Sequence, residues 1–212
     1  MTRDGILHRI RTALGRSAGQ AASPAVPPVR LVIPEIDREA RIGLFTARLE
    51  ALGGKTQRAA NGDEARALVA AALEGKTAVA SNAPLLAGCG IAELPGVETG
   101  ITDRAHLQAR CAAVNVGITS ADFALADTGS LVMLSSAQEA RLISLLPREH
   151  IAVVPMERML TGLDELFTLL PRPAEQTSSM VLITGPSRTA DIEQILVKGA
   201  HGPGQVTVIL VG

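Results

Sequence analysis

The chain has 212 residues, of which 47% are hydrophobic and 19% charged, and its formal net charge is −1. This length suits one ordinary domain with a small appendage, and it suffices to bury a core without disulfide or metal staples. The near-zero charge and an aromatic content of 1%, with no Trp or Tyr, argue against a nucleic-acid binder or a polybasic membrane binder.

The N-terminal segment differs in composition from the rest of the chain. Ile6, Ile10 and Leu14 recur at helical spacing with Asp4 as the candidate N-cap, which predicts a short amphipathic helix. A proline-rich stretch follows and predicts a linker, so we expect residues 1–35 to form an arm. The chain has no secretory-type apolar segment and no apolar run of membrane-spanning length, and a cytoplasmic location is therefore expected.

The remaining residues, 36–212, are expected to form a single α/β domain of alternating helices and strands. The expected helices span residues 38–52, 63–75, 103–110, 137–146, 156–170 (with a break at Gly162) and 189–197. The expected strands span residues 56–59, 77–80, 112–118, 123–126, 130–135, 151–154, 180–184 and 206–211. Several strands are continuous apolar runs, which is typical of parallel sheets covered on both faces. The predicted fold is a three-layer α/β/α sandwich, mainly parallel, with an antiparallel element around residues 123–135.

Metal and cofactor motifs are weak in this sequence. The two cysteines, Cys89 and Cys111, are too few for a disulfide framework or for an iron–sulfur cluster held by four thiolates, and we expect both to be buried and reduced. No histidine has the spacing of a zinc site. Gly-Lys-Thr tripeptides at 54–56 and 75–77 lack the preceding glycine of a P-loop and precede strands. We therefore expect neither a metal nor a bound cofactor.

One candidate site lies in residues 182–204. A predicted strand runs into Gly185, and the following residues Ser187 and Arg188 open a predicted helix, whose free backbone N–H groups and adjacent guanidinium favour an anion. His201 lies in a glycine-rich turn, where an accessible imidazole suits a donor or an acid–base group. The alternative interpretations are an ordinary helix start with a solvated Arg and a plain turn histidine.

A second candidate site consists of hydroxyl and carboxylate side chains at the ends of apolar strands, with Arg141 in the next predicted helix. In open α/β sheets, ligands bind beyond the carboxyl ends of the strands, so we expect both segments to line one cleft that binds a small anion. The alternative is that Asp and Gly merely form the turns. The full predicted set is Thr119, Asp122, Asp127, Thr128, Gly129, Ser130, Arg141, Gly185, Ser187, Arg188 and His201.

Several blocks together resemble the LUD-domain family of lactate-utilisation proteins, in its lactate utilisation protein C branch. They are residues 117–122, 126–131, 145–147 with His150, and 184–193 with Gly199 and residues 201–203. Many relatives are expected to carry Glu at Asp127 and Thr at Ser130. The resemblance implies a fold similar to the NagB/RpiA/CoA-transferase group. It also implies a role in oxidising L-lactate to pyruvate alongside iron–sulfur partner subunits.

Two main functions are therefore expected, and the sequence leaves open whether the chain is itself an enzyme. In the first, the chain is a non-iron–sulfur subunit of a lactate-oxidising system with a small-anion cleft. In the second, it is an independent isomerase or acyl/CoA-transferase of the same fold group, with Asp122, Asp127 or Glu193 as base or nucleophile. A third, weaker hypothesis is a structural adaptor that docks through residues 1–35.

Overall fold

The structure is a computed structural model that describes residues 2–17, 33–190, 196–199 and 201–212. The chain divides into two compact units, Met1–Val32 and Ile33–Gly212. The first contains helix α1 (Arg3–Ala13), whose apolar residues Ile6 and Ile10 are exposed. The N-cap is Thr2 and not the predicted Asp4, because the Thr2 hydroxyl accepts a hydrogen bond from the Gly5 N–H at 3.3 Å. Asp4 lies in the first turn instead, where its charge favours the helix dipole.

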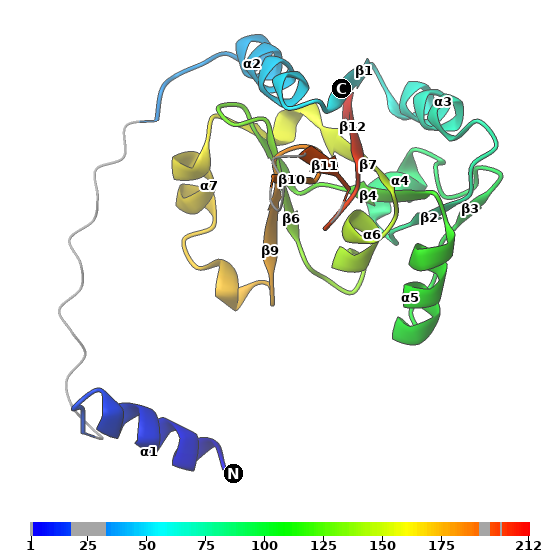
Figure 1. Cartoon of the computed structure of the whole chain (residues 1–212). Helices are drawn as coiled ribbons and strands as arrows, with labels where there is room; N and C mark the ends of the chain where they lie inside the picture. Colours follow the sequence, from blue (N-terminus) through cyan, green and yellow to red (C-terminus); the bar gives the residue numbers. More distant parts are fainter. Residues whose placement is uncertain (1, 18–32, 191–195, 200) are drawn as a thin grey trace. The chain divides into compact units, whose positions relative to one another are not determined.

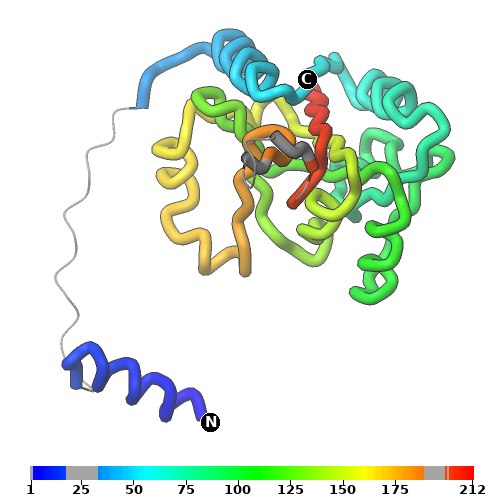
Figure 2. Tube along the Cα trace, viewed as in Figure 1, coloured from blue at the N-terminus to red at the C-terminus, as the bar shows by residue number. Residues whose placement is uncertain are grey.

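The second unit is built on a six-stranded, fully parallel sheet with the strand order β1-β12-β7-β4-β2-β3 (Figure 1). Its strands are β1 (Lys55–Ala59), β2 (Ala78–Ala80), β3 (Val97–Glu98), β4 (Val116–Ser120), β7 (Glu149–Pro155) and β12 (Gln205–Val211). Figure 2 follows the chain into its final strand, β12, which enters the sheet between β1 and β7. The predicted α/β class and the mainly parallel sheet are therefore confirmed.

A second, four-stranded sheet has the order β8-β5-β6-β9. Its strands are β5 (Phe123–Leu125), β6 (Ser130–Leu134), β8 (Met159–Leu160) and β9 (Met180–Ile183). β5 and β6 form the predicted antiparallel hairpin, β9 pairs antiparallel with β6, and β8 pairs parallel with β5. Ala124 and Leu131 of this sheet pack in one cluster with Ala152 and Val208 of the parallel sheet. One outer layer therefore contains a sheet as well as helices, which the predicted three-layer sandwich did not include.

The helices of this unit are α2 (Arg38–Ala51), α3 (Gly62–Leu73), α4 (Pro84–Gly88), α5 (Arg104–Ala113), α6 (Arg141–Leu145) and α7 (Leu163–Leu169), with short 3₁₀ turns η1 (Met156–Arg158) and η2 (Pro173–Glu175). Helices α3 and α4 pack on one face of the parallel sheet, whereas α2 packs on the other face together with the second sheet. Helix α7 covers the outer face of the second sheet (Figure 1). Asp103 caps α5, and Asn61 caps α3.

The predicted helix over residues 189–197 is wrong. β10 (Arg188–Ala190) pairs antiparallel with β11 (Leu196–Lys198), and residues 191–195 lie outside the described residues. Thr189 and Val197 are β-branched, a residue type that favours strands over helices.

Three other elements differ from prediction in their extent. The helix expected over 137–146 is only α6, because the residues before it form a turn on the Ser136 hydroxyl. The helix expected over 156–170 is divided into η1, β8 and α7, with the predicted break at Gly162. The strand expected from residue 112 begins at Val116, because α5 continues to Ala113.

Cys89 and Cys111 are buried, unpaired thiols, as predicted. Burial raises the pKa of both thiols, so both are weak nucleophiles. Within the described ranges, no helix combines the length and the apolar character needed to cross a bilayer.

Candidate functional site

The strand order places a topological switch point between β2 and β4. The chain leaves β2 for β3 on one side of the sheet, and it leaves β4 for β7 on the other. A crevice forms beyond the carboxyl ends of two such strands, because their connections run in opposite directions. Ser81 follows β2 and Ser120 ends β4, so these two serines mark the crevice.

A buried glutamate, Glu139, lies across these two strand ends. Its Oε1 accepts hydrogen bonds from the Ser120 backbone N–H at 2.8 Å, the Ser120 hydroxyl at 2.6 Å and the Ser81 hydroxyl at 2.9 Å. The turn that carries Glu139 is held locally, because the Ser136 hydroxyl accepts from the Glu139 N–H and the Asn82 N–H donates to the Gln138 carbonyl.

The second carboxyl oxygen of Glu139, Oε2, is buried and has no hydrogen-bond partner in the described part of the chain. Burial raises the pKa of Glu139, against the lowering effect of the serine hydrogen bonds, and the charge of Asp122 raises it further. A buried carboxyl oxygen without a partner is costly unless it carries a proton or faces a bound group. This arrangement favours the neutral acid with its proton on Oε2.

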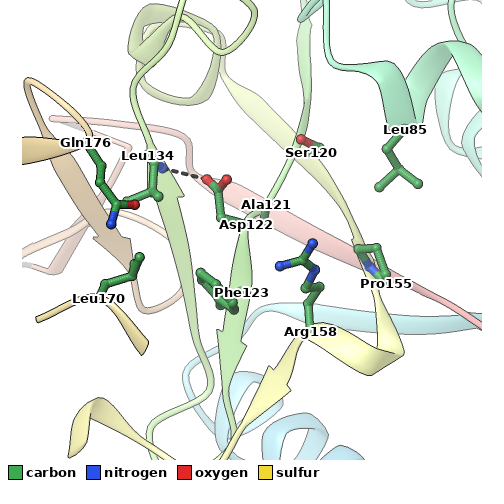
Figure 3. Close-up of a pocket in the computed structure, with 10 residues that line it drawn as sticks. All are labelled: Leu85, Ser120, Ala121, Asp122, Phe123, Leu134, Pro155, Arg158, Leu170 and Gln176. Atoms are coloured by element: carbon green, nitrogen blue, oxygen red, sulfur yellow. Dashed lines mark hydrogen bonds between the residues drawn. The ribbon is translucent and has the colours of Figure 1, made fainter. Parts of the chain in front are cut away.

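Ser120 connects Glu139 to a pocket of about 380 Å³ (Figure 3). The polar side chains around the pocket are Ser120, Asp122, Arg158 and Gln176, and the remaining walls are largely apolar. Much of the lining comes from the ends of β4 and β7 and from the segments that follow β2, β4 and β7, so the pocket lies at the carboxyl end of the parallel sheet.

Asp122 and Arg158 are the charged groups of this pocket, and Figure 3 shows the Arg158 guanidinium reaching toward Asp122 and Ser120. Asp122 Oδ2 accepts a hydrogen bond from the Leu134 N–H at 2.6 Å. Burial raises the pKa of Asp122, although this hydrogen bond and the Arg158 charge oppose the rise. The Arg158 guanidinium lies 5.6 Å from the centre of the Phe123 ring, and it forms no ion pair with any residue of the described ranges. It is therefore a cation that a ligand can neutralise.

Of the predicted site residues, only Asp122 lines this pocket. Thr119 is fully buried, and its hydroxyl lies 2.8 Å from His150 Nε2. Arg141 is exposed at the start of α6 and donates to the Ser179 hydroxyl at 3.3 Å. These two residues thus have structural partners outside the pocket.

Of the predicted residues 127–130, the first three belong to the turn between β5 and β6, and Ser130 is the first residue of β6. Gly129 has φ +68°, and a Cβ there would lie 2.5 Å from the backbone nitrogen of Leu49, so the turn packs tightly against α2. The Ser130 hydroxyl donates to Thr128 Oγ1 at 2.8 Å, whereas Asp127 and Thr128 are exposed. This geometry supports the alternative interpretation, in which these residues form a turn.

The structure does not bring the last predicted residues, Gly185, Ser187, Arg188 and His201, to the same cleft. β9, which precedes them, belongs to the second sheet. The Ser187 N–H donates a hydrogen bond to the carbonyl oxygen of Pro203. Pro203 lies just before β12 begins, at the amino end of the parallel sheet. Arg188 donates to the carbonyl of Leu52, and the His201 N–H donates to the Ser187 hydroxyl at 3.4 Å. These loops therefore lie at the opposite end of the parallel sheet from Asp122.

Sequence reasoning missed Glu139 and Arg158, whereas Ser120 lies within a predicted site segment but outside the predicted set of site residues. Ser120 had a signal, because it ends an apolar strand between two residues already selected. Glu139 and Arg158 fell inside predicted helices, and their relation to β4 depends on the strand order. In the described part of the chain, no group of three or more His, Cys, Asp or Glu residues is arranged to hold a metal ion.

Comparisons with known proteins agree with this architecture. The family model of the LUD domain matches residues 42–211. Lactate utilization protein C of Bacillus subtilis is 42% identical over 101 residues, which is 46% of this chain and 42% of that protein. The protein of the same name from Exiguobacterium sp. is 39% identical over 101 residues, 46% of this chain and 44% of that one. The matches thus cover about half the length of these relatives.

A solved structure supports the fold over most of the chain. A crystal structure of a DUF162 family protein from Deinococcus radiodurans superimposes with a TM-score of 0.64 and covers 84% of this chain and 100% of that one. The two sequences are 19% identical, so this similarity concerns the fold alone.

Proposed function

This chain belongs to the LUD-domain family, and from that premise we propose that it is a non-iron–sulfur subunit of a cytoplasmic L-lactate utilisation system. In this role its pocket at the carboxyl end of β4 binds a small carboxylate. The names of the relatives support the pathway. The two cysteines cannot supply the four thiolates of a cluster, so iron–sulfur partner subunits would carry the electrons.

The observation that carries the binding proposal is the Arg158 guanidinium without an ion-pair partner at a pocket otherwise lined by neutral and carboxyl groups. A guanidinium fits a carboxylate through paired N–H donors. Burial raises the pKa values of Asp122 and Glu139, whereas the charge of Arg158 lowers that of Asp122. Arg158 thus replaces Arg188 as the proposed anion-binding cation.

The binding proposal is tested by replacing the two arginines in parallel. We expect Arg158→Gln to weaken binding of L-lactate at least ~10-fold, because a charge-assisted hydrogen bond contributes about 1.5–3 kcal/mol. The matched control Arg188→Gln removes an exposed guanidinium at the other end of the sheet and should leave the affinity unchanged. Isothermal titration calorimetry measures both. The absence of binding by the wild type, or an equal loss in both variants, would refute the proposal.

The subunit role is tested by affinity purification of the tagged full chain from cells grown on L-lactate. We expect cysteine-rich iron–sulfur proteins to co-purify in fixed proportion, and we expect the isolated chain to turn over no lactate. Purification of the chain alone from such cells would count against the subunit role.

The second candidate function, an independent isomerase or acyl/CoA-transferase of the NagB/RpiA/CoA-transferase group, has one observation in its favour. Asp122 at the pocket and Glu139 behind Ser120 are two carboxyl groups with raised pKa values, which is typical of acid–base sites. Turnover of a small phosphorylated or carboxylated substrate by the isolated chain would favour this function.

A further inference from the structure

The hydroxyl of Ser120 has a fixed orientation in this site. Its Oγ lies 2.6 Å from Glu139 Oε1, which also accepts from the Ser120 backbone N–H and the Ser81 hydroxyl. A backbone N–H can only donate, so the oxygen that it faces is the acceptor of the carboxyl group. A proton on neutral Glu139 therefore resides on Oε2, the oxygen without a partner. In both charge states of Glu139, the Ser120 proton points to Oε1.

This orientation determines what Ser120 offers to the pocket. A serine hydroxyl has one proton and two lone pairs, and here the proton is already engaged by Glu139. Ser120 lines the pocket (Figure 3). A ligand there therefore meets the lone pairs of its hydroxyl oxygen. The Arg158 guanidinium, which reaches toward Ser120 in the same view, offers only donors. The pocket thus presents a cation and a nearby acceptor.

We propose that Ser120 is a specificity-determining residue that accepts a hydrogen bond from the hydroxyl of a small 2-hydroxy acid, and that Glu139 is the residue that positions it. This inference rests on the proposed function, and it adds that the pocket prefers 2-hydroxy acids to 2-oxo acids. With the ligand carboxylate on Arg158, the hydroxyl at C2 of a 2-hydroxy acid donates to Ser120. A 2-oxo acid presents a carbonyl oxygen there, which leaves two acceptors facing each other.

L-lactate and pyruvate are suitable probes, because they share the carboxylate and the methyl group and differ at C2. We expect the wild type to bind L-lactate roughly tenfold more tightly than pyruvate at neutral pH in isothermal titration calorimetry. Ser120→Ala should abolish this preference by weakening lactate binding and leaving pyruvate binding unchanged or stronger. A Ser120→Ala protein that keeps the wild-type ratio would overturn the inference.

The positioning role of Glu139 needs a conservative and a disruptive variant. Glu139→Gln retains a side-chain oxygen that accepts from the same three donors, so the preference for L-lactate should persist. Glu139→Leu removes that acceptor and frees the Ser120 hydroxyl to rotate, so the preference should fall to about that of Ser120→Ala. Circular dichroism checks folding. If Glu139→Leu does not fold, loss of the preference in Glu139→Gln would still contradict the positioning role.

The outcomes separate this inference from the proposal on which it rests. Equal binding of L-lactate and pyruvate by the wild type, abolished by Arg158→Gln, would overturn the role of Ser120 and leave the carboxylate pocket supported. Binding of neither acid by the wild type would refute the pocket and, with it, the role of Ser120.

Discussion

Replacing Gly117 by alanine is expected to destabilise the domain by at least ~3 kcal/mol. Gly117 lies in β4, a central strand between β7 and β2, and α6 crosses it closely. A Cβ at this position would overlap the carbonyl oxygen of Ile143 and lie 3.1 Å from Pro147 Cγ. The clash is with backbone, so rotation of a side chain cannot relieve it, and β4 and α6 have to separate.

The same substitution should also weaken the candidate site. α6 begins at Arg141, directly after the turn that carries Glu139. A shift of α6 away from β4 would therefore draw Glu139 away from Ser120. This would break the hydrogen bond of 2.6 Å that the Ser120 hydroxyl donates to Glu139 Oε1. We expect Gly117→Ala to lose ligand binding at temperatures where most of the protein is still folded.

Gly43→Ala is the matched control for this prediction. Gly43 lies in α2, and a Cβ added there would have no heavy atom of another element within 4 Å, so the new methyl group meets open space. Alanine in a helix interior should stabilise the domain by ~0.5–1 kcal/mol. Urea denaturation of both variants measures the two free energies of unfolding. If Gly117→Ala had the same free energy of unfolding as the wild type, β4 and α6 would not require this close contact.

Elements with a strong local pattern could be predicted from the sequence. The spacing of Ile42, Phe45 and Leu49 predicts the buried face of α2, and all three are at most 1% exposed. The Asp-Thr-Gly turn between two apolar runs predicts the β5–β6 hairpin. In both cases the signal lies within a few neighbouring residues, and the tertiary structure agrees with it.

Membership of a sheet could not be predicted in this way. β9 has the same apolar character as a strand of the parallel sheet, but it pairs antiparallel with β6 in the second sheet. Its partner is about 50 residues away along the chain, and no local pattern specifies that pairing. For this reason the structure does not bring the two predicted segments together, which would require the end of β9 to lie beside the end of β4.

The chemistry of the candidate site was only partly visible in the sequence for a related reason. Asp122 was selected because it directly follows an apolar strand, and this signal is local in the sequence. Glu139 and Arg158 reach the same place from later segments, through a strand order that sets β2 beside β4. Glu139 also fell within a predicted helix, whereas Ser136 holds it in a turn. Its role depends on contacts with Ser81 and Ser120, which are distant in sequence.

His150 is expected to make the stability of the domain fall steeply in mild acid. It lies in β7, only 1% exposed, with Nε2 2.8 Å from the Thr119 hydroxyl. Its Nδ1 is buried and has no hydrogen-bond partner among the described residues. Burial lowers the pKa of His150 from 6.5 to about 4, because a charged imidazolium would have no solvent there. The native protein therefore holds this imidazole in its neutral form.

The sign of the effect follows from proton binding in the two states. Between pH 6.5 and about 4, the unfolded chain protonates His150 and the native protein does not. The contribution of the neutral imidazole to stability is therefore complete above pH 6.5 and is lost as the pH falls toward 4. Between pH 6.5 and about 4, the contribution of His150 to the free energy of unfolding therefore falls by about 3 kcal/mol. Asp122 and Glu139, whose native pKa values are raised, act in the opposite direction, because they bind protons more readily in the native state.

A comparison of the wild type with His150→Gln separates these contributions, because both proteins carry the same carboxyl groups. We expect the variant to be less stable at pH 7, since the glutamine packs less well, but to lose about 3 kcal/mol less than the wild type between pH 6.5 and 4. Urea denaturation across this range gives both curves. NMR of the histidine ring in the wild type is the independent measurement, and it should show a neutral His150 at about pH 5. Parallel stability curves together with a ring that titrates near pH 6.5 would show that burial does not keep His150 neutral.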